Sequence, residues 1–570
     1  MKDKLIKILF RRKDGETIGR SLLPALTLSF ALSFLLMLYG PLELFFPNQK
    51  EFYFDVWLLL PELLKGFGLL LVVCMAAFVV CYVIHVRLYD LALLAAGVGF
   101  VCTYVQGMFL AGNLPPLDGR AMNWAAYSIQ NIYTYILWGV VILLTGFLVW
   151  RLKMVKMYRV LTGISLFLSA ILLVTGVSVG IMYGGFANDP DVAITTDGEF
   201  TMSTEENLVI FVVDAADSRT FQRLLETEDP QFADTLADFT YYPDTLCAYP
   251  FTEHSVPYIL TGQWYENRGE FTDYVSEAMA VSPLLTRLRQ EGYRMGAYEE
   301  DLSRYNDDSR MEFENVAEVE FEFTSTKELL KQELKLVWYK YAPFPLKQYV
   351  WVYLGDFNRI LSIKGEQENF WAANFEFKAD LETAQVETVA DKCFRFIHIE
   401  GAHVPFRYDS EANLIPSGTG TYDQNMEASM TLVKMYLELL KEAGVYDNTA
   451  IMIMGDHGYG YDRAHTTLGR GNALLAVKGI GEQHETMQTS SAPISYEDLQ
   501  EAYLRLLDGA AGDQVFDAEP GEDRSRRFIL YEYSEEDHMV EYALEGHAFD
   551  IENMAPTGQV YQYDPYGDGE

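Results

Sequence analysis

Five apolar stretches of about bilayer length lie in the first 189 residues. They run from Ser21–Phe46, Gly66–Ile84, Leu91–Leu110, Ile132–Trp150 and Val160–Tyr183. A helix needs roughly 20 apolar residues to cross a hydrocarbon core, so each stretch predicts a transmembrane span. Core helices of a soluble protein are the alternative, which five such stretches in succession disfavour. A cleaved signal peptide would explain only the first stretch, and that stretch lacks a small-residue cleavage site.

The pattern changes after residue 206 to short apolar runs that alternate with amphipathic stretches. The predicted strands are Leu208–Val213, Phe394–Ile399 and Ala450–Met454, and the predicted helices are Pro283–Gly292 and Tyr496–Leu507. Ser495 and Asp498 form a capping pair before the second helix. Strands that alternate with helices predict a mostly parallel sheet covered on both faces. The expected fold class is therefore an α-helical membrane domain with five spans, followed by an α/β domain.

Charge divides the chain at the same place. Residues 1–189 hold 15 Lys and Arg against 10 Asp and Glu, whereas the remainder holds 28 against 71. Lys and Arg gather in the amino-terminal tail and before the third and fifth stretches, which by the positive-inside rule places the amino terminus in the cytoplasm. An odd number of spans then places everything after Tyr183 outside the cell, in a multi-pass protein of the cell membrane. The acidic outer part is a poor binder of nucleic acid, because phosphate backbones require a basic surface.

These patterns predict four regions. Residues 1–186 form the five-span transmembrane domain, residues 187–206 a polar linker, residues 207–555 the extracytoplasmic α/β domain, and residues 556–570 an acidic flexible tail.

Candidate metal ligands follow the predicted strands. Asp214 follows the first strand, and Asp456 with His457 follows the third. His398 and His403 lie at the end of the second strand, and His465 comes soon after His457. Each residue alone is more often structural, but four of the nine histidines lie in two short segments at strand ends. Carboxylates and imidazoles that meet at one edge of a parallel sheet predict a divalent metal site.

Three motifs resemble the alkaline phosphatase/sulfatase superfamily, and the whole chain is similar to its membrane-anchored phosphotransferases. The motifs are Thr252-x-x-Ser255-Val256-Pro257, His398-x-x-Gly401-x-His403-x-Pro405 and Asp456-His457-Gly458. The similar enzymes include lipoteichoic acid synthases and phosphoethanolamine transferases, which also have five spans and one extracytoplasmic sulfatase-like domain.

The resemblance implies a role for each residue. Asp214, Thr252, Asp456 and His457 would bind the metal, manganese or zinc, and Thr252 would be the nucleophile that becomes phosphorylated. His403, His398 and His465 would contact the substrate phosphate or hold a second ion, and His465 stands closer to Asp456 than in the phosphoethanolamine transferases. Those transferases also carry Glu where this chain has Asp214, which is a competent ligand.

The implied activity is a membrane phosphotransferase. It would move a phosphoglycerol or phosphoethanolamine-type group from a phospholipid donor to a cell-envelope glycan or lipid acceptor. A phosphoester hydrolase (phosphodiesterase or phosphatase) of the same fold is the alternative, because both reactions use the same residues around the metal. A sulfuric ester hydrolase is disfavoured, since Thr252 occupies the formylglycine position and cannot form that aldehyde. A non-catalytic relative is disfavoured by the complete set of predicted ligands.

One segment departs from the acidic pattern of the outer region. Lys327–Lys347 holds five lysines against two glutamates, together with several aromatic residues. Lysines at four-residue spacing beside aromatic residues fit a helix in the headgroup region of a membrane, where it could help collect an anionic lipid. A surface helix packed on the sheet fits equally well.

Overall fold

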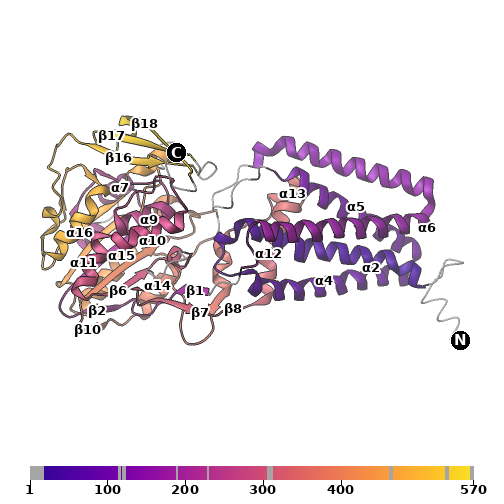
Figure 1. Ribbon diagram of the computed structural model, residues 1–570, viewed down its shortest axis with the longest axis horizontal. Coiled ribbons are helices and arrows are strands. Elements are labelled where there is room, and N and C mark those ends of the chain that lie inside the picture. The colour runs from indigo at the N-terminus through magenta and orange to yellow at the C-terminus, as the bar shows by residue number, and fades with distance from the viewer. Residues whose placement is uncertain are drawn as a thin grey trace. The chain divides into compact units, whose positions relative to one another are not determined.

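The computed structural model describes residues 18–112, 114, 117, 124–187, 191–227, 230–304, 312–416, 418–460, 466–532 and 538–564. The chain divides into two compact units. Unit 1 comprises Met1–Asp191 and Glu320–Lys364, and unit 2 comprises Val192–Val319 and Gly365–Glu570. The predicted boundaries placed residues 320–364 in the outer domain, whereas the structure groups them with the amino-terminal helices (Figure 1).

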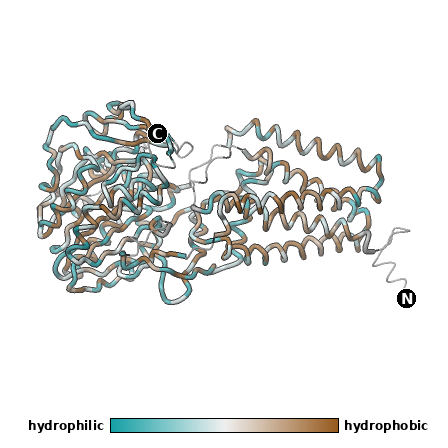
Figure 2. The backbone as a smooth tube through the Cα atoms, viewed as in Figure 1, coloured by the Kyte–Doolittle hydropathy of each residue, from teal (hydrophilic) through white to brown (hydrophobic). Residues whose placement is uncertain are grey.

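Unit 1 is built from long apolar helices. The first segment is α2 (Ile18–Phe34), which continues through the π-helical turn η1 (Leu35–Tyr39) into α3 (Gly40–Phe45) and η2 (Phe46–Glu51). The second is α4 (Val56–Ile84), and the third is α5 (Val86–Val105) with η3 (Gln106–Leu110). The fourth is η4 (Trp124–Tyr127) with α6 (Ser128–Met182). Four of these helical segments are long and apolar enough to cross a membrane. Large apolar side chains such as Leu69, Leu143 and Phe167 are more than half exposed, and Figure 2 shows apolar residues along the whole length of these helices. Water would penalise such surfaces, so they indicate a lipid surrounding.

The helix α6 contains two of the five predicted spans. Its 55 residues are far more than one crossing requires. The backbone at Lys153 is not helical (φ 62°, ψ 159°), and Figure 1 shows the chain turning back there. The predicted segments Ile132–Trp150 and Val160–Tyr183 lie on either side of this break, so the four helices contain all five apolar stretches.

The basic segment forms a helix of the membrane unit. The helix α12 (Thr326–Tyr341), followed by α13 (Phe344–Lys347), shares a hydrophobic cluster with the spans through Val337 and Tyr341. Thr326 Oγ1 donates to Glu62 Oε2 (2.6 Å), and Tyr341 Oη donates to Glu43 Oε2 (3.0 Å). The helix α12 therefore packs against the spans of its own unit, whereas one of the two predicted alternatives was a helix packed on the sheet. The rest of this insertion is β8 (Phe321–Phe323) paired with β9 (Leu361–Ile363), and the turns η7 (Leu354–Asp356) and η8 (Asn358–Ile360).

Three glycines let α12 approach the spans. A methyl group on Gly66 would lie 2.8 Å from Leu330 Cδ2, one on Gly40 would lie 3.0 Å from Val337 Cγ2, and one on Gly107 would overlap the ring of Tyr341. A side chain at Gly107 would therefore collide with the Tyr341 ring, and one at Gly66 or Gly40 would require Leu330 or Val337 to shift.

Unit 2 is centred on a seven-stranded sheet. Its order is β14 (Gln488–Thr489), β4 (Thr240–Tyr241), β13 (Leu475–Lys478), β12 (Thr449–Gly455), β3 (Asn207–Val213), β11 (Cys393–Ile399) and β6 (Arg294–Tyr298). The strands β12, β3, β11 and β6 run parallel, and β3, β11 and β12 are buried along their whole length. The three predicted strands are therefore confirmed within one residue at each end.

Helices cover both faces of this sheet, as predicted. They are α7 (Ser218–Thr227), α8 (Pro230–Thr235), α9 (Thr252–Thr261), α10 (Phe271–Val281), α11 (Pro283–Glu291), α14 (Asn374–Thr383), α15 (Tyr422–Glu442) and α16 (Leu499–Leu507). Phe211 of β3 packs against α14 and α15 on one face, while Met454 of β12 contacts Tyr503 of α16 on the other. Ser495 and Asp498 form the predicted capping box before α16.

Two short regions differ from the prediction. The expected linker contains β1 (Asp191–Ile194) and β2 (Thr201–Ser203), which pair with β7 (Val316–Val319) and β10 (Glu387–Val389). The expected flexible tail begins inside β18 (Met554–Gln562), which joins β16 (Ser525–Leu530) and β17 (His538–Glu545) in an antiparallel sheet. Backbone pairing outweighs the acidic, Gly-containing composition there, and residues 565–570 lie outside the described residues. A final pair joins β5 (Thr245–Leu246) to β15 (Ile494–Ser495).

The glycine contacts give a first prediction. Gly107→Ala should lower the stability of the detergent-solubilised protein by about 1–3 kcal/mol, because the new methyl group overlaps the Tyr341 ring. Gly99→Ala in the same span is the matched control, since nothing lies within 4 Å of a methyl group there. Adding Tyr341→Ala should remove most of the Gly107→Ala penalty. Equal melting temperatures for the two single alanine variants would contradict this packing.

Candidate metal and phosphoryl-transfer site

The candidate site lies where four parallel strands end side by side. Asp214 follows β3, Asp456 and His457 follow β12, and His398 lies near the end of β11. Glu299 follows β6, the outermost of the four strands. Since β12, β3, β11 and β6 are neighbours in that order, their carboxyl ends bring these side chains to one edge of the sheet.

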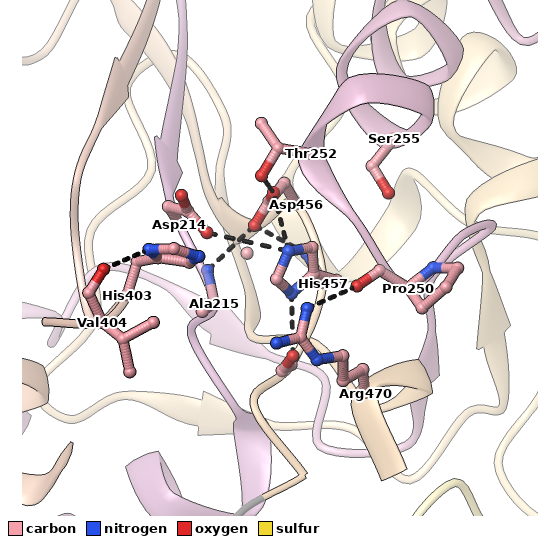
Figure 3. Close-up of polar contacts among 12 residues, drawn as sticks. Asp214, Ala215, Pro250, Thr252, Ser255, His403, Val404, Asp456, His457 and Arg470 are labelled. Carbon is pink, nitrogen blue, oxygen red and sulfur yellow. Dashed lines mark hydrogen bonds and ion pairs between the residues drawn. The ribbon is translucent and has the colours of Figure 1, made fainter. Parts of the chain in front are cut away.

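Asp456 is the most connected residue of the site. Its Oδ1 accepts hydrogen bonds from the backbone N–H groups of Ala215 (2.9 Å) and His457 (2.8 Å). Its Oδ2 accepts from Thr252 Oγ1 (2.7 Å). The side chain is fully buried, so one carboxylate links β12, the loop after β3 and the start of α9 (Figure 3).

Asp214, unlike Asp456, has a carboxylate oxygen without a hydrogen bond in the described part of the chain. Its buried Oδ1 has no hydrogen-bond partner among the described residues and lies 3.7 Å from His457 Nε2. Each of Asp214, Asp456 and His457 offers one ligand atom, and these atoms lie within 4.8 Å of one another. A buried carboxylate oxygen without a partner costs considerable free energy, which a bound cation would remove. These three side chains therefore fit a divalent metal ion.

His457 presents the correct nitrogen for such an ion. Its Nδ1 lies 2.8 Å from the carbonyl oxygen of Gly458, which can only accept, so Nδ1 donates and Nε2 carries the lone pair. Burial lowers the pKa of His457 to about 4. The imidazole is therefore neutral at physiological pH, as a metal ligand must be.

Close backbone contacts explain the glycines of the motifs. A methyl group on Gly401 would lie 2.5 Å from the backbone nitrogen of Asp214, and one on Gly455 would lie 2.6 Å from the carbonyl oxygen of Ala216. Gly401 also has φ +60°, a conformation that other residues seldom adopt. Both glycines allow the loop after β3 to bring Asp214 up to Asp456.

Thr252 is the first residue of α9. The first backbone N–H groups of a helix have no partner within the helix and carry partial positive charge, so the Thr252 hydroxyl stands at an end suited to a phosphate group. The nearby Ser255 donates to the carbonyl oxygen of Tyr249 (3.0 Å) instead, and Figure 3 shows its hydroxyl apart from the carboxylates.

The two histidines associated with β11 differ in charge. Burial tends to lower the pKa of His398, but the hydrogen-bonded carboxylate of Glu299 outweighs it and raises the pKa to about 10. Burial, reinforced by Arg470, lowers the pKa of His403. His403 Nδ1 donates to the carbonyl oxygen of Val404 (2.6 Å). One imidazole is therefore charged and the other neutral, the separation expected of groups that exchange protons.

Sequence reasoning missed two charged residues of the site. Glu299 follows a parallel strand, as Asp214 does, but β6 was not among the predicted strands. Arg470 lies in the turn η10 (Thr467–Gly471), is 5% exposed and donates to the carbonyl oxygen of Pro250 (3.0 Å). An arginine between two glycines in so acidic a region was the available signal. His465 lies outside the described residues, and the individual roles of the other predicted residues stay predictions.

A family model for sulfatases matches residues 206–509, so the chain belongs to the sulfatase family. This match confirms the superfamily resemblance inferred from the motifs. The candidate site therefore lies in an enzyme fold of the sulfatase superfamily. No curated protein sequence matches the chain significantly.

Solved structures match the chain at low identity and low TM-score. A Vibrio parahaemolyticus protein in the alkaline phosphatase superfamily is 11% identical (TM-score 0.33; 65% of this chain, 85% of that one). The periplasmic domain of EcEptC from Escherichia coli is 12% identical (TM-score 0.30; 65% and 98%). The structure of Ps i-CgsB with k-i-k-neocarrahexaose is 15% identical (TM-score 0.38; 60% and 82%). The family assignment rests on the sequence match alone.

Metal binding should release a proton. Burial and the neighbouring Asp456 raise the pKa of Asp214 well above its ordinary value, so the metal-free site keeps a proton that a cation must displace. Affinity for Mn²⁺ or Zn²⁺ should therefore rise about tenfold per pH unit below that pKa. Calorimetry in buffers of different protonation enthalpy measures the released proton. Asp214→Asn should bind more weakly and lose this slope, and a wild-type affinity independent of pH would contradict the assignment.

Proposed function

We propose that this protein is a membrane phosphotransferase. It moves a phosphoglycerol or phosphoethanolamine-type group from a phospholipid donor to a glycan or lipid acceptor of the cell envelope, through a phosphothreonine intermediate. The hydrogen bond from Thr252 Oγ1 to Asp456 Oδ2, at the start of α9 and beside Asp214 and His457, supports this proposal most directly.

The metal would be held by Asp214, Thr252, Asp456 and His457. Three oxygens and one nitrogen suit manganese as well as zinc. When bound, a divalent cation lowers the pKa of a coordinated hydroxyl group and offsets charge on phosphoryl oxygens.

The protein's own residues orient the reaction. Asp456 accepts the Thr252 hydroxyl hydrogen bond and so fixes the direction of Oγ1, while the first amides of α9 face the phosphate. Oγ1 forms a bond to phosphorus as the bond from phosphorus to the diacylglycerol oxygen breaks. Neutral His403 can accept the proton that Thr252 Oγ1 loses, and charged His398 can supply from Nε2 the proton that the departing diacylglycerol oxygen takes. In the second step an acceptor hydroxyl bonds to the phosphorus and gives its proton to His398, while the bond from phosphorus to Oγ1 breaks and Oγ1 takes a proton back from His403.

The membrane-spanning helices of unit 1 favour a lipid as the donor. The apolar helices anchor the chain in a membrane, and a donor dissolved in that membrane is available without diffusion through water. With the amino terminus in the cytoplasm, as the Lys and Arg distribution indicates, the catalytic unit works on the outer side of the cell membrane.

The test uses full-length protein in nanodiscs with Mn²⁺ or Zn²⁺ and headgroup-labelled phosphatidylglycerol or phosphatidylethanolamine. Wild type should release diacylglycerol and gain the mass of the headgroup phosphate on Thr252. Thr252→Ala should lose both by at least about a thousandfold, and Thr252→Ser should retain part of each. Ser255→Ala is the matched control for hydroxyl removal and should keep the activity. Cleavage of soluble phosphate esters without lipid turnover would replace the transferase by a hydrolase.

Glu299→Gln tests the charge of His398. Without the carboxylate, burial dominates and the pKa of His398 should fall from about 10 to below its ordinary value. His398 is charged only below its pKa, so the alkaline limb of the pH–rate profile should move down by several pH units. Metal affinity should stay close to that of wild type, which separates this effect from loss of the metal. An unchanged profile would remove His398 from the proton transfer.

A further inference from the structure

The outward side of α12 carries one continuous stripe of exposed residues. Lys327, Lys331, Leu334 and Trp338 are all exposed, and their spacing of four, three and four residues places them on one face of a helix. One flank of this stripe packs on the spans through Val337 and Tyr341. The stripe is therefore an exposed side of α12 that borders the spans.

The polarity of this stripe changes along the helix axis. Its first half presents the two lysines, and its second half presents Leu334 and Trp338, each 40% exposed. Leu346, next in space to Trp338, is also 40% exposed. The stripe extends about 16 Å at the usual helical rise.

The indole N–H of Trp338 is hydrogen-bonded within the protein, so the ring can lie in an apolar environment. Its Nε1 donates to the carbonyl oxygen of Leu346 (3.1 Å), so the only polar group of the ring is satisfied within the protein. A tryptophan that has no need of water can face acyl chains without an unpaired donor.

The amino-terminal end of the stripe is positively charged. Lys327, Lys331 and Lys335 share this end of α12 with Glu328, whose Oε2 is 2.8 Å from Lys331 Nζ, and with Glu333, which is buried. The local excess is positive in a chain whose net charge is −38. A positive cluster beside lipid-facing apolar residues complements an anionic headgroup layer.

We propose that the stripe from Lys327 to Trp338 is a lipid-binding surface that takes anionic phospholipids of the surrounding membrane. The lysines bind the headgroup phosphates, and Leu334 and Trp338 contact the acyl chains. The surface continues the lipid-facing apolar surface of the spans, where Leu64 and Leu69 of α4 are at least half exposed. It does not depend on the proposed transfer reaction.

The experiment measures how lipids quench Trp338 in the full-length protein. The protein is placed in nanodiscs that contain brominated phosphatidylglycerol or brominated phosphatidylcholine, and the difference between wild type and Trp338→Phe isolates this one indole. Brominated phosphatidylglycerol at equal fraction should quench that signal about twofold more than phosphatidylcholine, because it is enriched at the lysines. High salt should reduce the preference without any substitution.

A matched pair of variants tests the lysines. Lys327→Glu with Lys331→Glu should bring the quenching ratio close to one, whereas Lys434→Glu with Lys441→Glu on α15 of unit 2 should leave it unchanged. Equal quenching of wild type by the two lipids would overturn the anionic preference. Absence of quenching by both would overturn the lipid surface and indicate that the stripe faces water or a protein partner. Neither result bears on headgroup transfer, which the Thr252 variants test separately.

Discussion

The carboxylate of Asp456 is the constraint on which the rest of the site depends. It is fully buried and satisfied by two backbone N–H groups and the hydroxyl of Thr252. A buried charge is tolerated only when its partners are fixed. Those partners belong to β12, the loop after β3 and α9, so the position of Thr252, the proposed nucleophile, is tied to that of the central strands. Asp214, left without such partners, is the side chain that a cation completes.

The electrostatics of the site follow from which neighbour each histidine meets. His398 is near the end of β11 and contacts Glu299 after β6, so it keeps a proton. His403, four residues after β11, has a lowered pKa because it is buried and, secondly, because the charge of Arg470 opposes protonation. The difference in charge between the two histidines therefore arises from strand order, because without the carboxylate after β6 both imidazoles would be neutral. One proton donor and one proton acceptor are what a two-step transfer needs.

Much of this arrangement was predictable because its determinants are local in sequence. Buried strands are continuous apolar runs, and Asp214 and Asp456 follow them directly, so their meeting at one edge follows from parallel pairing. Glu299 and Arg470 were missed because β6 is short and mixed in polarity and η10 has no periodic pattern. The placement of α12 depends on Gly40, Gly66 and Gly107, which lie more than 200 residues away from it. Contacts so distant in sequence leave no periodic signal. The strand β18 was missed for another reason, because its pairing with β17 outweighs an unfavourable composition.

The insertion that contains α12 also adds connections between the two units of the chain. The chain passes between the two units three times, at residues 191–192, 319–320 and 364–365. A single tether would let the catalytic unit sample a wide volume, whereas each further connection removes freedom and raises the effective concentration of one unit near the other. The second and third connections flank the insertion that contains α12. Under the two proposals above, a lipid bound at α12 would have a raised effective concentration for the catalytic unit. A catalytic domain joined by one linker would lack this advantage, and that difference gives the insertion a physical purpose beyond anchoring.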